Sequence, residues 1–106
     1  MAPAAAEAKI PIAIKAHLMS AVRNPERLLW LFHAVNHPAI QLAYDYSHFQ
    51  LQNLTLDETL AAILPHTRFI HVKDASGTPE KVSFLLPGEG TIDYGAYFKK
   101  LHDAGY

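Results

Sequence analysis

Short apolar runs alternate along the chain with longer segments that have helical spacing. The apolar runs are Ile10–Ala16, Ile40–Tyr44 and Arg68–Val72, and each contains the β-branched or aromatic residues that favour strands. After each run, apolar residues recur every three or four positions, as they do on one face of an α-helix. The sequence therefore predicts three strand–helix units in succession.

Start signals mark the three predicted helices. Asn24 is a good capping residue and Pro25 suits a first helical turn, so the first helix is predicted to begin there. Thr55 and Glu58 have the spacing of a capping box, which places the start of the second helix. The third helix is predicted to start near Asp93, after a loop rich in Gly and Pro.

Helices that separate successive strands favour parallel pairing, because no hairpin turn can join the strands directly. The predicted fold class is therefore α/β with a parallel sheet. The connection from the third strand to the last helix, residues 73–92, is predicted to be a long loop. Connections of this length often serve as binding loops.

The length of 106 residues is enough for one domain with a modest core. We assign residues 10–106 to that domain and residues 1–9 to an N-terminal extension or the remnant of a preceding helix. The composition, 50% hydrophobic and 18% charged, is that of a globular protein and not of a disordered one. A net charge of −1 gives no general attraction for nucleic acid, so no nucleic-acid partner is expected.

The chain has no cysteine, so histidine and carboxylate side chains must supply any metal ligands. No apolar stretch reaches the ~18 to 20 residues that a membrane-spanning helix needs. The N-terminal residues have neither the basic start nor the apolar run of a secretory signal. We therefore expect a cytoplasmic protein with no membrane partner.

Candidate chemistry gathers where the second and third strands end. Asp45 and His48 follow one strand, His71 ends the next, and the mixture of oxygen and nitrogen ligands suits a divalent metal. Two plainer interpretations stay open: Asp45 as the cap of a following turn, and His71 as a core histidine. Pro87–Gly90 forms either a turn or a backbone cradle for phosphate.

These motifs resemble the xylose isomerase-like TIM barrels, and the sugar phosphate isomerases and epimerases most of all. The resemblance is carried by His17, Tyr44-Asp45-x-x-His48, His71-x-Lys73-Asp74, Pro87-Gly88-Glu89-Gly90 and the closing Ala104-Gly105-Tyr106. It implies a partial (β/α)8 TIM barrel in which this chain corresponds to the fifth, sixth and seventh βα units.

The resemblance also implies roles for individual residues. Asp45 and His71 match two of the family's four ligands for a divalent metal (Mn, Mg, Co or Zn). The residues implied to bind a sugar or sugar phosphate substrate are His17, His48, Lys73 and Asp74. The other two family ligands are glutamates, but Lys15 stands at the position of one, and the other would lie beyond Tyr106. We therefore expect a fragment or truncated member with an incomplete metal site.

Lys15 has several interpretations. It forms a structural ion pair with Asp45, holds an anionic or hydroxylated ligand together with Lys73 in place of the metal, or acts as a desolvated base or carbonyl nucleophile. The candidate catalytic residues are therefore Lys15 and His48. The leading hypothesis is a sugar (phosphate) isomerase/epimerase-like protein of doubtful activity in isolation. The alternatives are a non-catalytic sugar-binding or interaction module and, below it, an endonuclease IV-like phosphodiesterase. Because three parallel strands leave edges and one face uncovered, self-association or a chain that completes the barrel is expected.

Overall fold

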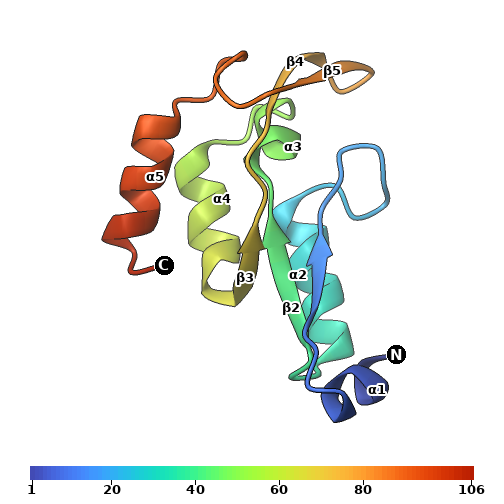
Figure 1. Cartoon of the computed structure of the whole chain (residues 1–106). Coiled ribbons are helices and arrows are strands. Elements are labelled where there is room, and N and C mark those ends of the chain that lie inside the picture. The colour runs from blue at the N-terminus through green and yellow to red at the C-terminus, as the bar shows by residue number, and fades with distance from the viewer.

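A three-stranded parallel sheet forms the centre of the computed structural model, which describes all 106 residues (Figure 1). The strands are β1 (Ile12–Lys15), β2 (Ile40–Tyr44) and β3 (Thr67–Ile70), and their order in the sheet is the order in the sequence. Both strand pairs are parallel, with a register shift at Leu42/Ala43 in the second pair. The predicted α/β class and the three strands are confirmed.

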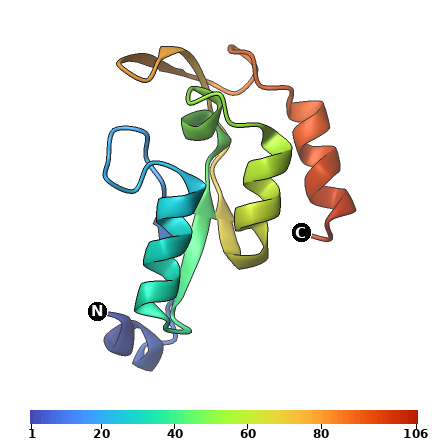
Figure 2. The same cartoon turned by 180° about the vertical axis from the view of Figure 1, so that it is seen from behind.

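Helices α2 (Pro25–Val35), α4 (Leu56–Ile63) and α5 (Tyr94–Asp103) correspond to the three predicted ones. The expected caps start them: Asn24 Oδ1 accepts from the backbone N–H of Arg27 at 2.9 Å, and Thr55 Oγ1 accepts from that of Glu58 at 3.2 Å. Figure 2 shows α2 and α4 in front of the strands, with α5 beside α4. The helices therefore cover one face of the sheet.

The core lies between this face of the sheet and the helices. Alternate residues of β2 point into it, as a strand with one face buried against helices requires. The core residues that are fully or almost fully buried include Leu28, Leu42, Tyr44, Ile63 and Tyr97. The hydroxyl of Tyr44 is 2.7 Å from that of Thr59, so the one polar group of this core strand has a partner.

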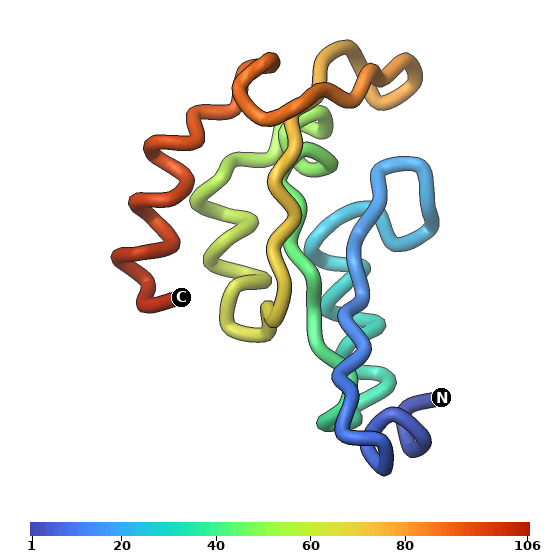
Figure 3. The backbone as a smooth tube through the Cα atoms, viewed as in Figure 1, coloured from blue at the N-terminus to red at the C-terminus, as the bar shows by residue number.

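The predicted long loop is in part wrong, because residues 74–85 form an antiparallel hairpin. Its strands are β4 (Asp74–Thr78) and β5 (Lys81–Leu85), joined by a two-residue turn. Gly77 in the hairpin has φ +95°, a conformation that favours glycine. Figure 3 shows that the hairpin lies beyond the C-terminal ends of the three parallel strands.

There are three further short helices, of which the first lies in the segment interpreted as an extension or the remnant of a preceding helix and the other two escaped prediction. They are α1 (Ala2–Glu7), α3 (Tyr46–Gln50) and the single 3-10 turn η1 (Leu64–His66). No residue of α1 is buried. The boundary after residue 9 stays a prediction. None of the helices is both long and apolar enough to cross a membrane.

The second face of the sheet carries no helix, as Figure 1 shows. Phe69 of β3, which is paired in register with Ala43, has 56% of its surface exposed. β1 and β3 are both edge strands of this sheet. The expected uncovered face and edges are therefore present in this chain.

Candidate functional site

The C-terminal ends of β1, β2 and β3, which we call the strand mouth, hold the candidate site. Asp45 follows β2 directly and is the N-cap of α3, because its Oδ1 accepts from the backbone N–H of Ser47 at 3.2 Å and from the Ser47 hydroxyl at 2.6 Å. The capping interpretation of Asp45 is thus confirmed. Only 1% of Asp45 is exposed, and its second oxygen, Oδ2, faces the strand mouth.

Two lysines converge on Asp45 Oδ2. Lys15 is the last residue of β1 and Lys73 follows β3, and the Nζ atom of each lies 3.4 Å from this oxygen. Because parallel strands end at the same edge of a sheet, three separate strands bring these side chains together. The ion pair between Lys15 and Asp45 that the sequence suggested is present, and Lys73 joins it.

His48 is fully buried in α3 beside this ion pair. Its Nε2 lies 3.5 Å from Asp45 Oδ2 and 3.1 Å from Lys73 Nζ, and its Nδ1 is 3.3 Å from the backbone N–H of Leu18. If Nδ1 accepts from the N–H of Leu18, the proton of the neutral ring is on Nε2. If Nε2 accepts from Lys73 instead, the proton is on Nδ1. A neutral imidazole makes only one of these two bonds at a time.

The charges of these groups follow from burial and from each other. Burial lowers the pKa of His48 to about 4, and Lys73 adds to this effect while Asp45 opposes it, so the ring is neutral at pH 7. Burial alone would raise the pKa of Asp45, but the hydrogen bond from Ser47 and the nearby positive charges outweigh it, so the pKa is lowered. Asp45 is therefore a carboxylate between two ammonium groups.

The hairpin forms an apolar wall beside these charges. The ring of Phe84, in β5, lies 3.8 Å from Lys73 Nζ, a cation–π distance, and contacts the rings of His48 and His17 edge-on. His17 itself lies against His48, with 4.2 Å between the ring centroids. Burial, followed by Lys15 and Lys73, lowers the pKa of His17. We call Lys15, His17, Asp45, His48 and Lys73 the mouth cluster.

Asp74 has a different place from the other predicted site residues. It is fully buried, and its carboxylate accepts from the backbone N–H groups of Ala75, Gly88 and Ile92 at 3.1–3.3 Å. A side chain on Gly90 would come within 2.1 Å of Asp74 Oδ1, so this close approach requires glycine. Asp74 thus holds the 87–92 loop in place, and its predicted role in substrate binding stays a prediction.

The hydrogen bonds of this loop decide between the two interpretations of Pro87–Gly90, a turn or a backbone cradle for phosphate. The N–H of Glu89 bonds to the carbonyl of Leu86 at 3.0 Å, and the Gly88 amide is already bonded to Asp74. The turn interpretation is confirmed. A phosphate cradle needs free amides, and the amide of Gly88 is not free.

His71 lies at the edge of the site. It is exposed, with its ring 5.0 Å from that of Phe69, so the core-histidine interpretation is wrong. Burial, followed by the charge of Lys15, lowers its pKa. No group of three or more His, Asp or Glu side chains converges for a metal ion, and Asp45 Oδ2 faces two ammonium groups. The residues of this chain alone do not fit a divalent cation, and the ligand roles of Asp45 and His71 stay a prediction.

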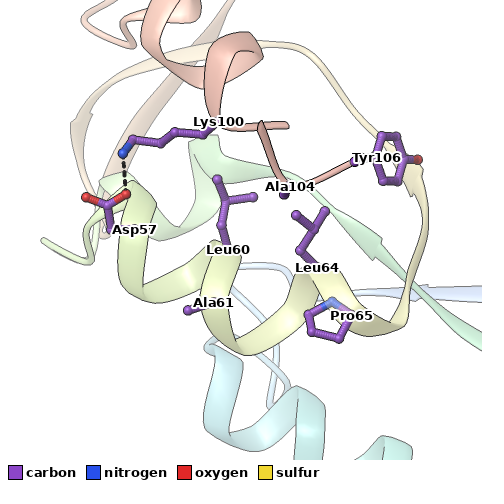
Figure 4. Close-up of a pocket in the computed structure, with 9 residues that line it drawn as sticks. Asp57, Leu60, Ala61, Leu64, Pro65, Lys100, Ala104 and Tyr106 are labelled. Carbon is purple, nitrogen blue, oxygen red and sulfur yellow. Dashed lines mark ion pairs between the residues drawn. The ribbon is translucent and has the colours of Figure 1, made fainter. Parts of the chain in front are cut away.

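The largest cavity of the molecule lies away from the mouth cluster, between α4 and α5. Its volume is about 490 Å³, its walls include Leu60, Leu64 and Tyr106, and the Lys100–Asp57 ion pair at 2.5 Å stands at its rim (Figure 4). It contains no predicted site residue. No residue of the mouth cluster lines a cavity of the molecule.

Comparisons with known proteins agree with this architecture. The model of the family described as xylose isomerase-like TIM barrel matches residues 1–106. No curated protein matches the chain. Two solved structures that match are a xylose isomerase domain protein from Planctomyces limnophilus, with 23% identity and a TM-score of 0.77, and the 3-keto-D-glucoside 4-epimerase from E. coli in its apo form, with 17% identity and a TM-score of 0.81.

This chain spans well under half the length of each of these two solved chains. The matches include 96% and 99% of this chain but 38% of each of the solved chains. At these identities the likeness concerns the fold alone. The three βα units therefore correspond to part of a barrel, as the resemblance implied.

Proposed function

The chain belongs to the xylose isomerase-like TIM barrel family, and from this membership we propose that its strand mouth binds a sugar or sugar phosphate as part of a sugar isomerase/epimerase-type site. The family includes sugar isomerases and epimerases, and its members generally use divalent metals. The observation that carries the proposal is the mouth cluster, which gathers charged and neutral polar groups at the strand ends where TIM barrels hold their active sites.

The mouth cluster offers what a sugar needs for recognition. The ammonium groups of Lys15 and Lys73 donate to hydroxyl or carbonyl oxygens, and the buried carboxylate of Asp45 holds both groups in place. Phe84 presents an apolar ring beside them, against which C–H groups of a sugar can pack. Donors and an apolar wall are thus within reach of one small molecule.

The same groups support proton transfer next to a carbonyl. Isomerisation and epimerisation require a base that removes a proton from carbon and a positive group that stabilises the oxygen on which negative charge develops. We assign the first role to neutral His48, whose buried ring a substrate reaches by displacing His17 or Phe84 from it, and the second to Lys15, whose ammonium group stands beside Asp45. No step of this scheme passes through a metal ion.

A second candidate is a sugar-binding module without catalysis. It is favoured by the ion pairs of Asp45 with Lys15 and Lys73. A lysine held in an ion pair stays protonated, so it can bind a ligand but does not act as a base or nucleophile. The two candidates share the ligand and differ only in turnover.

One experiment separates these candidates. The 106-residue chain is mixed in D2O with a panel of ketoses, aldoses and their phosphates, and NMR follows both binding and exchange of the proton next to the carbonyl. Exchange that is lost in His48→Gln but kept in His102→Gln supports the enzyme, since His102 lies on the exposed end of α5. Binding without exchange supports the module. The absence of binding by every member of the panel contradicts both.

We also propose that a further polypeptide segment, from a second copy or another chain, covers the open face of the sheet. Its support is the exposed Phe69 and the two unpaired edge strands, β1 and β3. Light scattering of the purified chain tests this proposal, and a compact monomer with a cooperative unfolding transition contradicts it.

A further inference from the structure

One positive charge is left over at the strand mouth. Lys15 and Lys73 share a single oxygen of Asp45, whose other oxygen is held by Ser47. Two ammonium groups therefore face one carboxylate. The neighbouring carboxylate, Asp74, forms no ion pair with either lysine, and its oxygens accept instead from three backbone N–H groups. Protonation of nearby histidines only adds positive charge.

This excess charge is within reach of a small molecule. The side chains of Lys15 and Lys73 are 27% and 28% exposed, whereas that of Asp45 is 1% exposed. Each ammonium group has three N–H donors; Asp45 engages one donor of each lysine and His48 can accept a second from Lys73, so both lysines keep at least one free donor. A ligand can therefore bond to both lysines without displacing the carboxylate. Water competes less at such a partly buried pair than at a fully exposed one, so the charge attracts an anion more strongly.

We propose that the strand mouth binds a hydroxylated small molecule that carries one anionic group, a carboxylate or a phosphate, held between Lys15 and Lys73. This inference rests on the proposed function and narrows its ligand to the charged sugar derivatives. The lysine pair supplies the positive charge and the N–H donors, and the buried carboxylate of Asp45 keeps the two ammonium groups together. The same pair repels a divalent cation, so this place favours an anion over a metal ion.

Calorimetric titration of the full 106-residue chain at fixed ionic strength tests the inference. The probes are gluconate, glucose 6-phosphate, glucose and inorganic phosphate. We expect the two charged sugar derivatives to bind about tenfold more tightly than glucose, the factor that one partly screened ion pair provides. Added salt should reduce this preference, because it screens the charges.

Variants identify the lysines responsible. Lys15→Met and Lys73→Met keep the length of the apolar stem and remove the charge, so each should abolish most of the preference for the charged sugars. Lys9→Met is the matched control, since Lys9 follows α1 at the opposite end of the strands, and it should leave the preference unchanged (Figure 1). Circular dichroism confirms that each variant is folded before it is compared.

The outcomes separate this inference from the proposed function. Equal affinity for glucose and gluconate overturns the anion site and leaves sugar binding intact. No binding of any sugar derivative overturns the proposed function as well. Inorganic phosphate binding as tightly as glucose 6-phosphate supports the lysine pair and contradicts recognition of the sugar. A preference that survives both lysine substitutions overturns the assignment of these residues.

Discussion

Mild acid should destabilise the protein through His48. The pKa of this histidine falls from 6.5 to about 4 because the ring is buried, with a further contribution from Lys73, His17 and Lys15 against the opposing charge of Asp45. Between these two pH values the unfolded chain takes up a proton that the folded chain does not bind. Stability conferred by the neutral ring is therefore present above pH 6.5 and is lost as the pH falls towards 4.

The size of this effect follows from the two pKa values. The difference between the two pKa values corresponds to about 3 kcal/mol of unfolding free energy over the whole titration. About 2 kcal/mol of this stability is lost between pH 7 and pH 5. His17 and His71 also have lowered pKa values and contribute in the same direction. Between pH 7 and pH 5 the unaltered chain should therefore lose at least about 2 kcal/mol of unfolding free energy.

Urea unfolding followed by circular dichroism, at pH 7 and pH 5, measures the change. His48→Gln should be less stable at pH 7, because the buried ring packs against its neighbours, but should lose about 2 kcal/mol less than the unaltered chain on acidification. His102→Gln, on the exposed end of α5, is the control and should behave as the unaltered chain does. Equal pH dependence in the His48 variant and the unaltered chain would refute the reasoning.

Four further results are expected. Asp45→Asn should lower the free energy of unfolding by about 1–2 kcal/mol, because it keeps the cap but leaves two part-exposed ammonium groups without a carboxylate. Asp45→Ala should lower it by about 1 kcal/mol more, because the cap is lost as well. Urea unfolding that finds Asp45→Asn as stable as the unaltered chain contradicts this. Gly90→Ala should cost about 2 kcal/mol or shift the amide NMR signals of the 87–92 loop, since its Cβ would lie 2.1 Å from an Asp74 oxygen, whereas Gly95→Ala in α5 should be tolerated. Lys15→Glu should bind Mn²⁺ or Co²⁺ with one-to-one stoichiometry in calorimetry where the unaltered chain does not; tight metal binding by the unaltered chain argues against the lysine's role. Phe69→Lys should lower the average mass in light scattering if the open sheet face mediates association, and an unchanged mass speaks against that face.

Periodicity and capping signals were enough to predict the parallel βα units. The caps at Asn24, Thr55 and Asp93 are local bonds between a side chain and the backbone N–H three residues later, so their residues reveal them without any tertiary information. The hairpin was missed because Gly77 and Pro79 indicated an irregular loop. The alternation of Val82 and Phe84 with polar neighbours was the available signal for β5.

The composition of the mouth cluster was predicted better than its geometry. The strand ends at Lys15, Asp45 and His71 were visible in the sequence, and parallel strands bring such ends together. Nothing in the sequence indicated that the Asp74 carboxylate accepts from the amides of the 87–92 loop, since that depends on how this loop folds back. Nor did it reveal Phe84 as a wall, because its contacts with Lys73 and His48 join separate elements.

The central claim, that the mouth cluster is a ligand site, is tested most directly by NMR of the histidine side chains. Gluconate is titrated into the labelled chain at constant pH and ionic strength. The account predicts that the ring signals of His17 and His48 move together and saturate, while those of His33 and His66, which lie against Phe32 outside the mouth cluster, stay in place. Shifts confined to residues near the cavity between α4 and α5, or no saturable shift at the mouth cluster, would contradict it.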